Sequence, residues 1–108
     1  MRLRNVKNAN KIICKGKYYI NNPYEYKGCF SKLFKNENPI YIEIGMGKGD
    51  FIINNALDNP DINFIGIEKY DSVLVRAIQK TDPLEINNLK LIRLDATNID
   101  SIFDHEID

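Results

Sequence analysis

The sequence predicts an α/β fold that forms one half of a doubly wound parallel sheet, in the order β-α-β-α-β. Short apolar runs rich in β-branched residues recur after residue 39, and segments with the apolar spacing of helices separate them. A glycine-rich turn, GMGKGD, joins the first of these runs to the first helical segment. Strands that alternate with helices of about ten residues imply βαβ units with parallel strands and right-handed crossovers.

Five elements are expected along the second part of the chain. The apolar runs predict strands, the spacing of apolar residues predicts helices, and the NPD stretch between them predicts a break. Asp71 or Ser72 is placed to cap the second helix. In order, the expected elements are a strand at 40–44, a helix at 51–59, a strand at 63–69, a helix at 71–81 and a strand running into a loop at 90–99.

The first part of the chain is basic and less regular. Residues 1–39 hold nine Lys and Arg against two acids, whereas residues 40–108 hold six against thirteen, so a net +7 precedes a net −7. Such an arm suggests an anionic partner such as nucleic acid, although a solvated terminus is an equal alternative. We expect residues 1–17 to pack little and a short helix near Tyr26–Phe34. Residues 1–38 are therefore predicted to form a basic arm, and residues 39–108 the N-terminal half of a cofactor-binding domain.

Composition excludes several classes of protein. The 108 residues contain no apolar run of the roughly 18 residues that a membrane span needs, and the first residues lack the apolar stretch of a signal peptide. We therefore expect a cytoplasmic protein. Cys14 and Cys29 are too far apart for a metal or redox motif, and His105 stands alone, so free thiols and no metal are expected.

Three alternate glycines follow the first expected strand in the pattern E-x-G-x-G-x-G. Gly45, Gly47 and Gly49 permit positive φ and a close approach of backbone to a ligand at the start of a helix. A dinucleotide site needs G-x-G-x-x-G, but Asp50 stands at the last position, and the carboxylate of Glu43 disfavours a phosphate. These features make an NAD-dependent dehydrogenase improbable and favour a cationic or hydrogen-bond-donating ligand.

Two further acids stand at the ends of the other expected strands. Glu68 closes FIGIEK and Asp95 follows LIRL, so with Glu43 they would meet at the carboxyl edge of a parallel sheet. Glu68 comes 19 residues after Gly49, a spacing that suits a carboxylate binding both hydroxyls of a ribose. Singly, each acid could be a solvated strand end or a turn residue. Together they indicate a ligand with a ribose, a flat base and positive charge near Glu43.

These features fit S-adenosylmethionine, and here the sequence resembles the class I methyltransferases. More narrowly, RLRNVK, NPIYIEIGMGKGDFI, NPDINFIGIEKYDSVLVRAIQK and NLKLIRLDA are similar to the bacterial tRNA (guanine-N7-)-methyltransferase family. The resemblance implies a Rossmann-like class I methyltransferase fold, S-adenosylmethionine as cofactor, and methyl transfer to N7 of guanine 46 in the variable loop of tRNA. The family's catalytic segment, Asn-Phe-x-Asp-Pro-Trp-Pro-Lys, has no match. We therefore expect the chain to stop before its catalytic residues and to be inactive alone.

The resemblance also assigns residues to roles. Glu43, Glu68 and Asp95 would lie near the methionine, ribose and adenine parts of the cofactor, with Gly45, Gly47 and Gly49 shaping the loop. RNA phosphates would be bound by Arg2, Arg4 and Lys7, and by Lys48 unless it is simply an exposed lysine. The alternatives are a noncatalytic cofactor-binding or RNA-binding fragment and a class I methyltransferase with another substrate.

Overall fold

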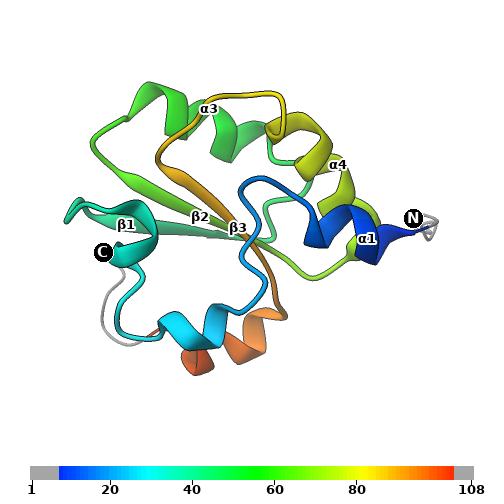
Figure 1. The fold of residues 1–108 in the computed structure, drawn as a ribbon, viewed down its shortest axis with the longest axis horizontal. Coiled ribbons are helices and arrows are strands. Elements are labelled where there is room, and N and C mark those ends of the chain that lie inside the picture. The colour runs from blue at the N-terminus through cyan, green and yellow to red at the C-terminus, as the bar shows by residue number, and fades with distance from the viewer. Residues whose placement is uncertain (1–7, 104–108) are drawn as a thin grey trace.

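The computed structural model describes residues 8–103 and has a three-stranded parallel sheet at its centre (Figure 1). The strands are β1 (Ile40–Ile44), β2 (Asn63–Glu68) and β3 (Leu89–Arg93), and they lie in the order β1-β2-β3. All pairings are parallel, with Ile42 opposite Ile65 in the first pair of strands. The prediction of an α/β fold with a β-α-β-α-β sheet is confirmed. The carboxyl ends of the three strands therefore lie at one edge.

Helices cover both faces of this sheet (Figure 1). The face above the sheet in the figure carries the two crossover helices, with α1 beside α4, whereas short helical turns lie below it. The crossover helices form because apolar side chains recur on one side of each, such as Ile52, Ile53 and Ala56. The helices above are α1 (Ala9–Cys14), α3 (Asp50–Asp58) and α4 (Asp71–Thr81), and the turns below are η1 (Pro23–Tyr26) and η2 (Ala96–Ser101). The short helix α2 (Ser31–Phe34) packs through Phe34 with the cluster on that second side.

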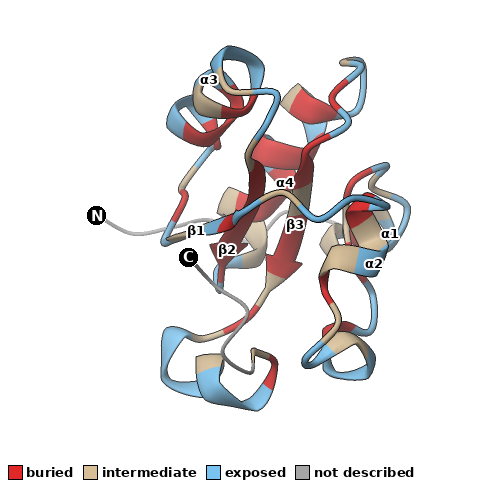
Figure 2. Ribbon diagram, turned by 90° about the vertical axis from the view of Figure 1, so that its left-hand side faces the viewer, coloured by how far each residue is buried: buried red, intermediate tan, exposed pale blue. Residues whose placement is uncertain are grey.

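The core consists of two apolar clusters, one on each face of the sheet. Every residue of β2 is buried, and Figure 2 shows buried residues gathered on the central strands. The N-terminal arm contributes to both clusters: Ile13 and Tyr18 pack with the α3 and α4 layer, and Phe30 packs with the opposite layer. The expectation that residues 1–17 pack little is therefore wrong for Ile13, which is fully buried. Ile13 is buried because α1 packs against α4, a tertiary contact that the local sequence does not reveal.

The arm also covers the outer edge of the sheet. The backbone N–H of Ile20 donates to the carbonyl of Leu91 at 2.9 Å, and the N–H of Leu91 donates to the carbonyl of Tyr18 at 2.9 Å. These two bonds satisfy backbone groups that an edge strand would otherwise expose. The arm is thus joined to β3 by backbone as well as by side chains.

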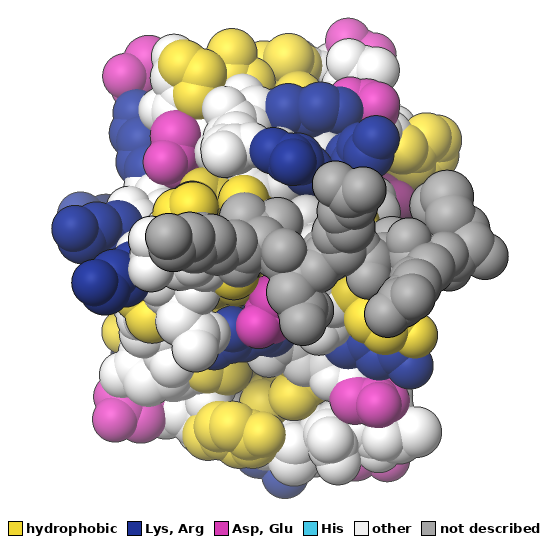
Figure 3. All heavy atoms as spheres, turned by 90° about the vertical axis from the view of Figure 1, so that its right-hand side faces the viewer, with side chains coloured by type: hydrophobic (Ala, Val, Ile, Leu, Met, Phe, Trp, Pro, Cys, Tyr) yellow, Lys and Arg dark blue, Asp and Glu magenta, His cyan; other side chains and the backbone are white. Residues whose placement is uncertain are grey.

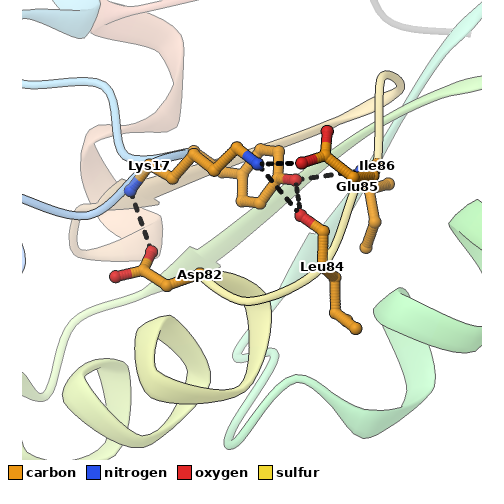
Figure 4. A network of polar contacts seen from close by, with 6 residues as sticks. Lys17, Asp82, Leu84, Glu85 and Ile86 are labelled. Carbon is orange, nitrogen blue, oxygen red and sulfur yellow. Dashed lines mark hydrogen bonds and ion pairs between the residues drawn. The ribbon is translucent and has the colours of Figure 1, made fainter.

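A polar network holds the same part of the arm against the loop between α4 and β3 (Figure 4). The backbone N–H of Lys17 donates to Oδ1 of Asp82 at 2.9 Å, and its Nζ lies 3.0 Å from Oε1 of Glu85. The hydroxyl of the buried Tyr18 donates to the carbonyl of Leu84. This network fixes the segment that leads from α1 into the edge of the sheet.

Two local predictions are wrong. Instead of one helix near Tyr26–Phe34, the chain forms η1 and α2, because Gly28 lies between them with a φ of 80° and interrupts the helix. The cap of α4 is Tyr70, without a side-chain hydrogen bond, and Asp71 is the first helical residue. The side chain of Asp71 is free to bind elsewhere, as described below.

Some predictions fall outside the described residues. Arg2, Arg4, Lys7 and His105 belong to residues 1–7 and 104–108, so the expected contacts of the first three with RNA remain predictions. Within residues 8–103, no helix is long and apolar enough to cross a membrane.

Candidate functional site

The glycine loop leaves β1 and is anchored to β2 by backbone and side chain. The backbone N–H groups of Gly45 and Met46 both donate to the carbonyl of Ile67, at 2.8 and 3.1 Å. The side chain of Met46 is buried against Gly66, where an added Cβ would lie 2.3 Å from the methionine sulfur. Gly66 therefore makes room for Met46, and Met46 fixes the loop on the sheet.

Two of the three loop glycines face open space. Gly45 and Gly47 have φ values of 70° and 61°, and no atom lies within 4 Å of a Cβ built on either. Gly49 differs, because it begins α3 with a φ of 88° and its Cβ position would contact Ala77 at 3.4 Å. The first two glycines leave space for a ligand, and the third allows α3 to approach α4.

Glu68 ends β2 as a buried carboxylate with three backbone partners. Its Oε1 accepts from the N–H of Gly47 at 3.0 Å, and its Oε2 accepts from the N–H groups of Lys69 and Tyr70 at 3.1 Å each. A carboxylate offers about four acceptor positions, so capacity for one further donor remains. Glu68 thus connects the glycine loop to the start of α4.

Asp95 follows β3 and caps η2. Its Oδ1 accepts from the backbone N–H and the hydroxyl of Thr97, both at 3.0 Å. These two bonds stabilise the charged form and hold the pKa of Asp95 below its ordinary value, with a smaller contribution from Lys69. The side chain is oriented, and no hydrogen bond within residues 8–103 engages its second oxygen.

These residues surround a cavity of about 350 Å³ at the carboxyl edge of the sheet. Four of the six predicted cofactor contacts line it, namely Gly45, Gly47, Glu68 and Asp95. Its other walls are mostly apolar. They are formed by Ile44, Ile67, Lys69, Tyr70, Val73, Leu94 and Ala96.

The other two predicted contacts, Glu43 and Gly49, are not part of this lining. Because side chains alternate along a strand, Glu43 points to the α3 side of β1, whereas Ile40 and Ile42 belong to the opposite cluster. Glu43 is half-buried, and desolvation raises the pKa of its carboxyl. Lys48, on the loop between them, is exposed.

Sequence reasoning missed the wall that follows β2. Lys69 and Tyr70 lie directly after Glu68, and the Nζ of Lys69 sits 5.0 Å from the centre of the Tyr70 ring. The ring is half exposed, although an aromatic side chain of this size is usually more buried. The position of GIEKYD at the end of a parallel strand was the signal that could have identified both residues.

The composition of the cavity suits a nucleoside with a positively charged group. Aliphatic and aromatic side chains form a surface for a flat base, and the one deeply buried polar group, Glu68, is a carboxylate that can accept from hydroxyls. The open positions over Gly45 and Gly47 leave room for such a ligand against backbone. The residues present therefore fit S-adenosylmethionine. Among residues 8–103, no cluster of three or more His, Cys, Asp or Glu could hold a metal ion.

The face that carries α1 has mixed charge. Figure 3 shows Lys and Arg side chains in several separate groups on this face, with acidic side chains between them. Two of the lysines of α1 and its C-terminal end, Lys11 and Lys15, are exposed. The positive charges on the described part of the arm are therefore spread out. Such a distribution suits separate contacts with several phosphates and not a single deep anion pocket.

A family model and several curated relatives all compare this chain with methyltransferases. A model of the family described as "Putative methyltransferase" matches residues 37–107. A tRNA (guanine-N(7)-)-methyltransferase of Lachnoclostridium phytofermentans is 50% identical over 103 residues, which are 95% of this chain and 48% of that protein. The enzyme of the same name from Bacillus subtilis is 49% identical over 85 residues, or 79% of this chain and 40% of that protein. A third, from Ureaplasma parvum, is 48% identical over 108 residues, or 98% of this chain and 48% of that protein. The chain spans about half the length of these curated relatives.

Proposed function

The chain belongs to this methyltransferase family, and on that premise we propose that its protein transfers a methyl group from S-adenosylmethionine to N7 of a guanine in tRNA. Relatives about 50% identical over 95% of the chain carry the name of this activity, which supports the tRNA substrate. Guanine 46 of the variable loop is the proposed acceptor, and the cytoplasm the proposed location. The observation that best supports S-adenosylmethionine as the cofactor is the cavity, which is lined by Gly45, Gly47, Glu68 and Asp95.

In this proposal the described residues bind and orient the cofactor. Glu68 accepts a hydrogen bond from a ribose hydroxyl, in addition to the three backbone donors that already hold it. Asp95 is held by Thr97 and turns its other oxygen to the base. Glu43 does not line the cavity, and in this proposal its negative charge acts on the cationic methionine end from the neighbouring strand. S-adenosylmethionine, when bound, supplies an electrophilic methyl group on a sulfonium sulfur.

The proposed acceptor is consistent with a cofactor site that contains no general base. N7 of guanine carries an available lone pair, so no proton has to be removed before it attacks a methyl group. Rate then depends chiefly on holding the reacting atoms close and in line. In this proposal the residues of this chain hold the cofactor, which is the methyl donor, in place. The acceptor side, including the expected aspartate segment, is proposed to lie in the other half of the protein.

The test is calorimetric titration of S-adenosylmethionine into the purified protein and into its Glu68→Ala variant. Loss of the carboxylate removes the acceptor for ribose and releases three backbone donors, so affinity should fall at least tenfold. Arg76→Ala is a matched control, because Arg76 is exposed on α4 and its guanidinium binds only Gln79 among the described residues. Equal affinity of wild type and Glu68→Ala would contradict the ribose assignment.

A second experiment tests the acceptor. The whole protein, in which the proposed acceptor half is joined to this chain, should methylate a tRNA transcript that carries guanine at position 46 and should not methylate the same transcript with adenine there. Cofactor binding without methylation of either transcript would favour a noncatalytic cofactor-binding fragment. Methylation of both would indicate a class I methyltransferase with another target.

A further inference from the structure

Arg93 lies at the point where the arm, α4 and the end of β3 meet. It is the last residue of β3, and its side chain is 30% exposed. Its Nη1 donates to Oδ1 of Asp71 at 3.0 Å and to Oδ1 of Asn10 at 2.7 Å. One guanidinium nitrogen thus joins β3 to the first residue of α4 and to α1.

Both chain segments that Arg93 joins continue directly into the cavity. Asp71 follows Lys69 and Tyr70, which form one wall, and Arg93 itself precedes Leu94 and Asp95, which form another. Beneath these walls the pairing of β2 with β3 ends at Glu68 opposite Arg93, and one further backbone bond follows, from the N–H of Leu94 to the carbonyl of Glu68 at 3.3 Å. Beyond the last strand pair, the charge-assisted bond of Arg93 to Asp71 joins the two segments that continue into the walls.

The pair is partly shielded from water, which makes it more than an ordinary surface contact. The side chain of Asp71 is 46% exposed and that of Arg93 30%, and the half-buried Tyr19 lies close enough for Arg93 to influence the pKa of its hydroxyl. Burial is the larger influence on Tyr19 and raises its pKa, whereas Arg93 lowers it. An arginine held by three elements loses little further freedom when it binds a carboxylate.

We infer that Arg93 is a positioning residue for the cofactor site: its contacts with Asp71 and Asn10 set the spacing of the two cavity walls and tie that spacing to α1. The inference rests on the proposed function, since the ligand is S-adenosylmethionine. Arg93 itself does not line the cavity, so its effect on the ligand is exerted through Tyr70 and Asp95. Asn10 belongs to α1, the helix whose exposed Lys11 is proposed to meet RNA, so the pair is tied to that helix through Asn10.

The test separates positioning from folding by reading two quantities in one titration. S-adenosylmethionine is titrated calorimetrically into the wild-type protein and into Arg93→Ala, Arg93→Lys and Asp71→Asn, with Arg76→Ala as control. Irreversibly inactive molecules lower the number of sites per molecule, whereas reversible unfolding raises the apparent Kd by a factor set by the folded fraction, which urea unfolding of each variant measures. Loss of positioning raises the Kd beyond that factor and leaves the number of sites unchanged.

We expect Arg93→Ala to raise the Kd about tenfold, because a charge-assisted bond between the two walls is lost. Arg93→Lys should recover part of this loss, since an ammonium keeps the positive charge and can donate to the same acceptors but sits on a shorter side chain. Asp71→Asn keeps the shape of the residue and should raise the Kd less than Arg93→Ala. Combining the two should add nothing beyond Arg93→Ala, because both remove the same contact.

The outcomes distinguish this inference from the proposed function. Binding by the wild type together with an unchanged Kd in Arg93→Ala and Asp71→Asn overturns the positioning role alone. If Arg93→Ala does not fold, the Kd of the near-isosteric Asp71→Asn decides. A wild-type protein that does not bind S-adenosylmethionine overturns the proposed function, and the inference with it.

Discussion

At the scale of single residues, the acids of the site differ in how much the protein itself stabilises their charge. Glu68 is buried but accepts three backbone hydrogen bonds, and Asp95 accepts two from Thr97. Glu43 is half-buried, and no described residue forms an ion pair or hydrogen bond with it. A carboxylate that is desolvated without a partner costs stability unless a cation binds beside it. Glu43 is therefore the residue at which stability and ligand binding should oppose each other.

Glu43→Gln should stabilise the protein without ligand at neutral pH. Desolvation raises the pKa of Glu43 in the folded state, so the folded protein binds more protons than the unfolded chain between the two pKa values. Stability therefore falls as pH rises through the raised pKa, and the penalty is complete above it. Glutamine removes that penalty. Urea unfolding of wild type and variant from pH 3.5 to 7.5 should show a higher midpoint for the variant at pH 7.5.

The same series contains its own control. Below about pH 4, the ordinary range of a glutamic acid, wild-type Glu43 is protonated in both states, and the two midpoints should converge. A difference that is constant across the series would show that hydrogen bonding or packing, and not charge, distinguishes the two side chains. S-adenosylmethionine should bind the variant more weakly at pH 7.5, because the cationic end loses its partner.

At the scale of elements, the glycine loop and β2 form one packing unit. The position of Gly66 in the middle of a central strand is explained by Met46, whose sulfur occupies the space where a Cβ would be. We expect Gly66→Ala to lower the free energy of unfolding by about 2 kcal/mol, as an extra methyl group does in a filled core. It should also weaken cofactor binding, because Met46 must leave its position and carries Gly45 and Gly47 with it.

A double-mutant cycle tests this coupling. In a Met46→Ala background the added methyl group has space, so Gly66→Ala should cost less than in the wild type, by on the order of 1 kcal/mol. Unfolding in urea gives the four free energies. Additive effects would mean that Ile52 and Leu91, which also lie within 3.3 Å of the Cβ position, are the groups that resist the substitution.

The elements also explain which features could be predicted from sequence. The helix at 71–81 and the strand at 40–44 were predicted at their observed bounds. Their apolar residues recur at the spacing of the side that each element buries, so the pattern is visible in the sequence. Glu68 and Asp95 could be found because strand ends of a parallel sheet must meet at one edge. The roles of Arg93 and Gly66 could not, because each depends on a tertiary contact, with Asn10 and Asp71 or with Met46, that has no local pattern. The break at Gly28 was missed because helical spacing on both sides outweighed a single glycine.

At the scale of the whole molecule, the two edges of the sheet differ. The arm covers the outer edge of β3 through the bonds of Tyr18 and Ile20 to Leu91. At the other edge, β1 pairs with β2 on one side and has no strand on its outer side among residues 8–103, and its Tyr41 and Ile44 are 44% and 50% exposed. An open edge with exposed apolar side chains is suited to pairing with a further strand. The part of the arm that holds Tyr18 and Ile20 therefore covers one edge of the sheet, and the edge at β1 stays open among the described residues.

The last prediction concerns the contribution of α1 to binding of tRNA. Lys11 and Lys15 are exposed, and no described residue forms an ion pair with either, so they can release counterions from RNA phosphates. Replacing both by glutamine should weaken binding and lower the slope of log K against log salt by roughly one per lysine. Fluorescence anisotropy with labelled tRNA at several salt concentrations measures both quantities. Lys80→Gln is the control for net charge, because the Nζ of Lys80 lies 2.5 Å from Oδ1 of Asp50 and its charge is already offset. An equal change per charge in that variant would show that tRNA responds to the overall field of the protein and not to contacts with α1.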